Sequence, residues 1–232
     1  TLFPTLRNLP INADTPINQS IVQSMFSEAN QYMKDGVLLR QIINVIDSLE
    51  LDDYDEIHAF GEIYETILKE LQNAGSSGEF YTPRAVTEFM ANMINPKIGE
   101  KMADFACGTG GFITSWLKEL DKKVQTADDR KKFERSIYGI EKKQFPYMLC
   151  VTNLLLHGID NPTIDHGNSL IHDVLDYTDK DKFDVILMNP PYGGNEKKDV
   201  QNHFPSDIAS SETADLFMAV IMYRLKKNGR AA

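Results

Sequence analysis

The stretch Phe183–Gly194, FDVILMNPPYGG, decides the fold of this chain because an apolar run stops there at two consecutive prolines. Residues 183–188 have the length and composition of a strand that is buried on both faces, as strands of parallel sheets are. Proline has no amide hydrogen for a strand ladder, so Pro190 and Pro191 end this strand in a rigid turn. Ligands of open α/β sheets bind at the carboxyl ends of the strands. We therefore expect a binding site at this turn.

Short apolar runs alternate with helical patterns from Gly78 onward. This alternation predicts an α/β domain, residues 78–232, in which helices connect parallel strands. A turn around Gly229 leads toward a further strand, so we expect the last strands of the sheet to be missing from the sequence. The predicted strands are residues 101–106, 136–140, 163–165 and 183–188, and the predicted helices are 83–93, 111–120, a short one within 121–135, 144–156 and 212–226.

Residues 1–77 have a different pattern, which predicts a helical domain in front of the α/β domain. Prolines at positions 4, 10 and 16 indicate an irregular opening segment over residues 1–16. Beyond it, apolar residues recur at helical spacing, and we expect these stripes to pack between helices and against a core. The stripes cover residues 18–33, 38–49 and 54–71.

Composition limits the classes of function. A net charge of −10 opposes autonomous binding to a phosphate backbone, so a DNA substrate would need positive charge from a partner chain, an absent segment or a local patch. Two cysteines and five histidines form neither a disulfide framework nor a zinc pattern, and no metal site is predicted. No apolar run is long enough to span a membrane and no signal peptide opens the chain, so we expect a soluble cytoplasmic protein.

A glycine-rich turn follows the first predicted strand, in Asp104–Phe112, DFACGTGGF. Glycines let backbone amides approach a ligand closely, and the start of the following helix adds partial positive charge. The spacing does not fit a P-loop, which needs Lys before Ser or Thr, or the dinucleotide fingerprint, which needs glycine where Ile113 stands. A different ligand and a tight turn without a ligand both remain open from these residues alone.

An acidic side chain, Glu141, comes just after the next predicted strand, in Ile137–Lys143, IYGIEKK. A carboxylate there can accept hydrogen bonds from both hydroxyls of a ribose. The alternative is a solvated helix start, because acidic residues favour helix N-termini. The position of Glu141 one strand after the glycine turn favours the ribose interpretation.

The turn Asn189–Tyr192 suits chemistry on a planar amino group. The lone pair of an adenine amine is delocalised into the ring, and the amine becomes nucleophilic when two acceptors hold its hydrogens out of plane. The side-chain oxygen of Asn189 and the backbone carbonyl of Pro190 are candidate acceptors, and Tyr192 can stack on an extruded base. The rest is in-line positioning against an activated methyl group, without a metal. The alternative is a proline turn that merely closes the strand.

These three stretches together resemble the amino-methyltransferase superfamily, in which NPPY is the signature for amino groups of adenine, cytosine or glutamine. Gly78–Arg84, GEFYTPR, is similar to the cofactor-binding segment of the methylation subunit of type I restriction-modification enzymes. The resemblance covers nearly the whole chain. It implies a class I S-adenosylmethionine-dependent methyltransferase fold, Rossmann-like, and methyl transfer from S-adenosylmethionine to the 6-amino group of adenine in DNA.

The resemblance also implies residue roles. Many relatives contact the cofactor's adenine with an acidic residue, whereas this sequence offers Asn168, whose amide can still hydrogen-bond an adenine edge. The implied catalytic residues are Asn189, Pro190, Pro191 and Tyr192. The implied cofactor-binding residues are Glu79, Phe80, Tyr81, Thr82, Pro83, Arg84, Asp104, Ala106, Thr109, Gly110, Gly111, Phe112, Glu141, Asn168 and Ser169.

The family acts on double-stranded DNA with a flipped adenine, and the resemblance therefore implies partner chains. A specificity subunit and a second methylation subunit would clamp the DNA, and a restriction subunit with nuclease and translocase activity is a further partner. The motif order, with no room for an inserted recognition domain, resembles the gamma arrangement. Recognition by another subunit makes the acidic charge expected, and restriction-modification implies a prokaryotic source.

Two other functions fit parts of the sequence. A protein glutamine methyltransferase would use the same turn, but it explains neither the long helical region nor GEFYTPR. A catalytically silent cofactor-binding fragment is the non-enzymatic alternative, and the intact Asn189–Tyr192 turn argues against it.

Overall fold

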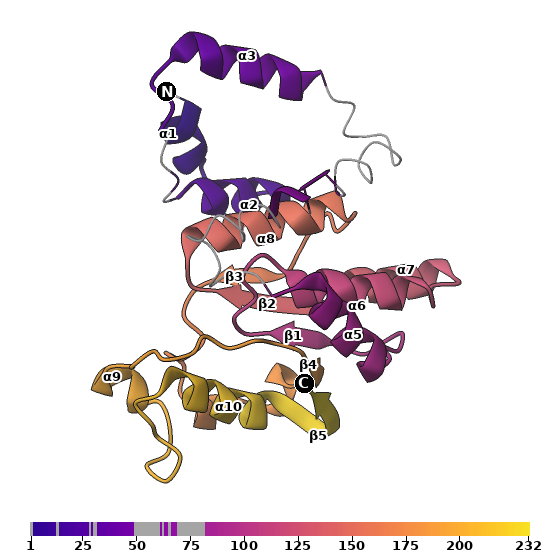
Figure 1. Ribbon diagram of the computed structural model, residues 1–232, viewed down its shortest axis with the longest axis vertical. Helices are drawn as coiled ribbons and strands as arrows, with labels where there is room; N and C mark the ends of the chain where they lie inside the picture. The colour runs from indigo at the N-terminus through magenta and orange to yellow at the C-terminus, as the bar shows by residue number, and fades with distance from the viewer. Residues whose placement is uncertain are drawn as a thin grey trace.

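The computed structural model describes residues 2–12, 14–27, 29, 32–48, 61, 63–64, 66–68 and 82–232. Within them lies one parallel sheet in the order β3-β2-β1-β4-β5, which confirms the predicted α/β class (Figure 1). The chain lays down β1, β2 and β3 in one direction and then continues with β4 on the other side of β1, so the strand order reverses between β1 and β4. The strands are β1 (Met102–Asp104), β2 (Ile137–Glu141), β3 (Ile164–His166), β4 (Phe183–Ile186) and β5 (Leu225–Ala231).

The helices of the α/β region begin and end at residues suited to those positions. α5 starts after Pro83 and stops at Asn95, which takes the left-handed conformation with φ 55°. α7 begins with a capping box between Thr126 and Asp129. The helices are α5 (Arg84–Ile94), α6 (Gly111–Asp121), α7 (Ala127–Glu134), α8 (Gln144–Leu156), α9 (Lys198–Gln201) and α10 (Thr213–Arg224), with short 3-10 turns at Val174–Asp176 and Asp179–Asp181.

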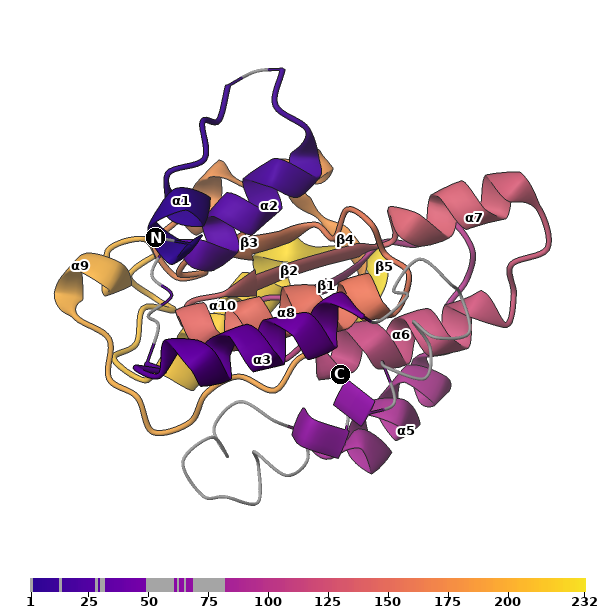
Figure 2. The same ribbon diagram turned by 90° about the horizontal axis from the view of Figure 1, so that it is seen from above.

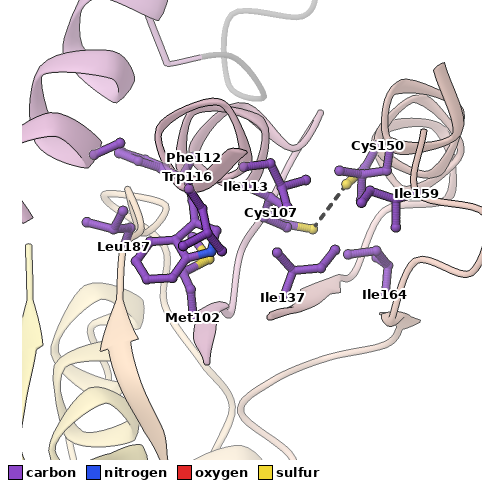
Figure 3. Close-up of a cluster of buried hydrophobic side chains, with 14 of the residues drawn as sticks. Met102, Cys107, Phe112, Ile113, Trp116, Ile137, Cys150, Ile159, Ile164 and Leu187 are labelled. Carbon is purple, nitrogen blue, oxygen red and sulfur yellow. Dashed lines mark hydrogen bonds between the residues drawn. The ribbon is translucent and has the colours of Figure 1, made fainter. Parts of the chain in front are cut away.

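The core consists of two layers because successive strand residues point to opposite faces of the sheet. Met102 and Val185 belong to the cluster under α5, α6 and α8, whereas their neighbours Ala103 and Ile186 belong to the cluster under α10. Figure 3 shows the first cluster, in which Trp116 of α6 is fully buried and lies beside Met102. Helices on both faces explain why every residue of β1 is buried and why β4 is buried at all positions except Asp184.

The predicted elements agree with the structure except near their ends. Helix 144–156 has the predicted bounds, and the other predicted helices and strands of the α/β region differ by one to three residues. β5 is irregular, since its pairing with β4 jumps from Phe183↔Leu225 to Val185↔Arg230 around Asn228, which has φ 66°. The turn expected near Gly229 thus lies inside β5. The two 3-10 turns and α9 have no counterpart in the prediction.

Three helices are described in the N-terminal region, namely α1 (Leu2–Arg7), α2 (Ile17–Phe26) and α3 (Gly36–Asp47). The prediction of an irregular segment over residues 1–16 was wrong for α1, where Pro4 lies in the first turn and removes no helical hydrogen bond. α2 packs on α8, and the Gln144 amide donates to the carbonyls of Ser24 and Met25 (Figures 1 and 2).

The apolar stripe of α3 was expected to be packed, and this expectation was wrong for the described structure, because no residue of α3 is buried. Amphipathic spacing predicts a helix, but it does not name the surface that covers it. Most of the third stripe, residues 54–71, lies outside the described residues, and the described positions 61, 63, 64 and 66–68 are helical. The domain boundary at residues 77/78 also lies outside them and stays a prediction. No described helix is long and apolar enough to cross a membrane.

Candidate active site

A cavity of about 560 Å³ opens at the carboxyl ends of the strands, where the strand order reverses. The turns after β1, β2, β3 and β4 all contribute to its wall. This is the position that open α/β sheets give to their ligands. The volume lies in the range of small-molecule sites, which is roughly 300–1,000 Å³.

The glycine turn after β1 is shaped by backbone conformations that only glycine adopts readily. Gly108 and Gly110 have φ values of 54° and 83°. A Cβ atom on Gly110 would lie 2.8 Å from Sγ of Cys150 on α8, so this position also requires the smallest residue. The Asn153 side chain of α8 donates to the Thr109 carbonyl at 3.1 Å. The turn is therefore held against α8 on one side and faces the cavity on the other.

Glu141 is the last residue of β2 rather than the first residue after it, and it is 7% exposed. Its Oε2 atom accepts from the Gly108 backbone amide at 2.9 Å, and Oε1 accepts from the Lys143 amide at 2.7 Å. Each carboxylate oxygen has more than one lone pair, so both oxygens can still accept from a ligand. The side chain is thus fixed with free acceptor capacity at the cavity wall.

Asp104 is a second buried carboxyl group in the same wall. Burial raises its pKa to about 8, and the negative charge of Glu141 acts in the same direction, while a hydrogen bond from the Ala106 amide opposes the shift. A cation bound in the cavity would favour the ionised form of Asp104. The wall can therefore match a positively charged ligand.

The turn after β4 presents Asn189 with both ends of its side-chain amide engaged. Its Nδ2 atom donates to Oγ1 of Thr82 at 3.3 Å, and its Oδ1 atom accepts from the Tyr192 hydroxyl at 2.9 Å. Asn189 lines the cavity and is not part of the core. Tyr192 is 76% exposed. Pro190 and Pro191 line the cavity as well.

The turn after β3 closes the wall beside Glu141. Oδ1 of Asn168 accepts from the Leu170 amide at 3.1 Å, which leaves its Nδ2 group available to donate. The Ser169 hydroxyl donates to the Phe105 carbonyl and so joins this turn to the one after β1.

Most of the predicted site residues in the described part of the chain line this one cavity. They are Thr82, Asp104, Ala106, Thr109, Gly111, Phe112, Glu141, Asn168, Ser169, Asn189, Pro190, Pro191 and Tyr192. Pro83, Arg84 and Gly110 are not among the lining residues, and Arg84 instead donates to Oγ1 of Thr114 at 3.0 Å and covers Gly111. Glu79, Phe80 and Tyr81 lie outside the described residues.

The cavity also has lining residues that the sequence did not single out. Some stand beside the predicted ones and were signalled by the same motifs, whereas Thr213 and Phe217 of α10 belong to no motif and reach the cavity only through packing. The additional residues are Phe105, Cys107, Gly108, Lys142, Lys143, Gly167, Leu170, Gly194, Glu196, Thr213 and Phe217. Among the residues that the structure describes, no group of three His, Cys, Asp or Glu side chains could hold a metal ion.

Comparisons with known proteins give one family for this chain. The family described as N-6 DNA Methylase matches residues 55–232. The EcoEI type I restriction enzyme methylase subunit of Escherichia coli is 48% identical over 100% of this chain and 47% of its own length. The MpnII type I methylase subunit of Mycoplasma pneumoniae is 32% identical over 84% of this chain and 38% of its own length.

Solved structures give the same result. A modification subunit of a putative type I restriction enzyme from Vibrio vulnificus superposes with a TM-score of 0.83 at 41% identity, covering 97% of this chain and 47% of that one. A putative class I S-adenosylmethionine-dependent methyltransferase from Listeria monocytogenes, at 17% identity and a TM-score of 0.60, covers 99% of this chain and 62% of that one and shares the fold. The chain spans about half the length of the curated relatives that it matches.

Proposed function

The chain belongs to the N-6 DNA methylase family, and from this premise we propose that its protein transfers a methyl group from S-adenosylmethionine to the 6-amino group of adenine in DNA. It would do so as the modification subunit of a type I restriction-modification system. The observation that carries the proposal is that the glycine turn, Glu141 and Asn189 line one cavity. A site for a nucleoside cofactor and a site for an amino group are then within one space.

The residues of the wall fit S-adenosylmethionine by their chemistry. Glu141 keeps acceptor capacity on both oxygens, as two ribose hydroxyls require. Asp104 supplies negative charge when ionised, which suits the ammonium and sulfonium groups of the cofactor. The bound cofactor supplies a methyl group on a positively charged sulfur. We also assign cofactor binding to the other cofactor-binding residues predicted from the sequence, Asn168 and Ser169 included.

The chain's own residues prepare the amine. Oδ1 of Asn189 and the carbonyl oxygen of Pro190 accept the two hydrogens of the amino group and hold them out of the ring plane, which returns the lone pair to nitrogen. The ring of Tyr192 provides a stacking surface for a flipped base. Pro190 and Pro191 keep this turn rigid, so that amine and methyl group meet in line without further reorganisation.

The partners follow from the same proposal. A net charge of −10 on this chain opposes binding to DNA phosphates by this chain alone. We assign the neutralisation of phosphates to a specificity subunit, with a second methylation subunit completing the clamp around DNA and a restriction subunit joining for cleavage. The complex would act on double-stranded DNA in the cytoplasm of a prokaryote. Residues 78–232 would form the catalytic domain and residues 1–77 a helical domain beside it.

The test is methyl transfer by the full-length protein together with its specificity subunit. Labelled S-adenosylmethionine is offered with an adenine-containing duplex and, separately, with a glutamine-bearing protein. We expect label in the duplex, recovered as N6-methyladenine after digestion to nucleosides. Label in the protein alone would support the glutamine methyltransferase instead, and cofactor binding without transfer to either would support a silent assembly fragment.

A further inference from the structure

The orientation of the Asn189 side-chain amide matters, because one end accepts hydrogen bonds and the other donates them. Oδ1 accepts hydrogen bonds and Nδ2 donates them, while the amine that it serves has only hydrogens to offer. The site therefore works with Oδ1 toward the base and not with the amide rotated by 180°. Something on the other side of the amide has to accept from Nδ2.

Thr82 is placed to do this. Its Oγ1 atom accepts from Nδ2 of Asn189 at 3.3 Å across 107 positions of sequence. Thr82 lines the cavity immediately before Pro83 and helix α5, whose first turn is closed by hydrogen bonds from Val86 and Thr87 to the Pro83 carbonyl. The threonine hydroxyl thus stands on a backbone that a proline and a helix hold in place.

The second hydrogen bond of the amide cannot replace it. The Tyr192 hydroxyl donates to Oδ1, the atom that serves the base, so it competes with the substrate amine for that oxygen and does not hold the Nδ2 end of the amide. Tyr192 is also 76% exposed. Among the hydrogen bonds that the described residues make to Asn189, the one that holds Nδ2 is made with Thr82.

We propose that Thr82 is a positioning residue that holds the Asn189 amide with Oδ1 toward the substrate amine. The inference rests on the proposed function and gives this threonine a task beyond the cofactor segment in which the sequence places it. It also links the segment before α5 directly to the turn after β4.

The experiment compares Thr82→Val, which keeps the shape and removes the hydroxyl, with Thr82→Ser, which keeps the hydroxyl. Both are made in the full-length protein with its specificity subunit. Three quantities are measured: single-turnover methyl transfer, the Kd for S-adenosylmethionine by calorimetry, and extrusion of the target adenine from the fluorescence of 2-aminopurine placed beside it. One net hydrogen bond corresponds to roughly a 10-fold change in rate.

For Thr82→Val we expect single-turnover transfer at saturating cofactor to fall about 10-fold, a loss larger than any rise in the cofactor Kd, with the extrusion signal within about 2-fold of wild type. Thr82→Ser should recover most of the rate. An equal loss in cofactor affinity and rate for Thr82→Val would overturn the inference and make Thr82 a cofactor contact only. Failure of Thr82→Ser to recover the rate would overturn it too.

A double-mutant cycle with Asn189→Asp provides a second readout. A carboxylate has two equivalent oxygens and needs no orientation, so Thr82→Val should cost little further rate in that background. The same 10-fold loss in both backgrounds would contradict a positioning role. Failure of the proposed function is distinguishable, because the wild-type complex would then place no methyl group on an adenine duplex.

Discussion

Replacing Gly110 with alanine should disturb the cofactor-binding side of the cavity although Gly110 does not line it. Gly110 has φ 83°, a conformation that costs an L-residue about 1–2 kcal/mol. The new Cβ atom would lie 2.8 Å from Sγ of Cys150, which is fully buried on α8 and hydrogen-bonded to Sγ of Cys107 at 3.8 Å (Figure 3). Overpacking of this kind costs about 1–3 kcal/mol.

Loss of glycine's freedom in the unfolded chain returns up to about 1 kcal/mol. The expected net loss in the free energy of unfolding is therefore about 1–4 kcal/mol. The glycine turn has to shift away from α8 and toward the cavity. We expect this shift to weaken the binding of S-adenosylmethionine by at least about 1.4 kcal/mol, which corresponds to a 10-fold rise in Kd.

Urea denaturation and cofactor calorimetry measure the two effects, and Gly158 offers a matched control. Gly158 has φ 74°, and no atom lies within 4 Å of the position that a Cβ would take there, so Gly158→Ala reports the backbone cost alone, about 1 kcal/mol. Adding Cys150→Ala to Gly110→Ala should recover the part of the loss that is due to overpacking. If Gly110→Ala cost no more than Gly158→Ala, or if removing Sγ recovered nothing, packing against α8 would not be what holds this turn.

Two further predictions concern the charge and the gating of the site. Asp104→Asn should stabilise the protein relative to wild type, by an amount that grows to a few kcal/mol as pH rises from about 4 to about 8. A carboxyl whose pKa is raised on folding stabilises the fold only while it is protonated, and it loses its proton over that window. Urea denaturation at pH 5 and pH 8 measures the difference in free energy of unfolding between variant and wild type, and an equal difference at both pH values would show that Asp104 ionises as easily in the folded as in the unfolded chain. Tyr192→Phe removes the hydroxyl that competes with the base for Oδ1 of Asn189, so extrusion of the target adenine, reported by 2-aminopurine placed beside it, should appear at about 3-fold lower protein concentration. An unchanged midpoint would mean that this contact does not oppose base entry.

The fold was predictable where periodicity and turn chemistry agree. The proline pair after β4 and the glycine turn after β1 both mark strand ends, and a parallel sheet brings strand ends to one edge, so the cavity follows from the order of the motifs. Helix 144–156 has the predicted ends, and Pro146 in its first turn and Gly158 after its last turn are residues suited to those boundaries.

Other features could not be read from the sequence because they depend on contacts between distant segments. Thr213 and Phe217 line the cavity only because α10 packs under β4, and no local pattern encodes that contact. Gly110 and Arg84 belong to motifs, yet one packs on α8 and the other on Thr114, since a motif fixes the path of the backbone and not the direction of every side chain. The exposed stripe of α3 is a further case, because amphipathicity does not specify a partner.

The proposed function divides the cavity in two, with the Asn189 turn handling the amine while the glycine turn and Glu141 hold the cofactor. Asn189→Ala in the full-length complex separates these halves when cofactor Kd and single-turnover methyl transfer are determined on the same preparation. We expect a Kd within about 3-fold of wild type and a rate reduced by roughly 1,000-fold, the scale seen when a group aimed at the reacting atoms is removed. A cofactor Kd that rises in step with the loss of rate would assign Asn189 to the cofactor and refute this division of the site.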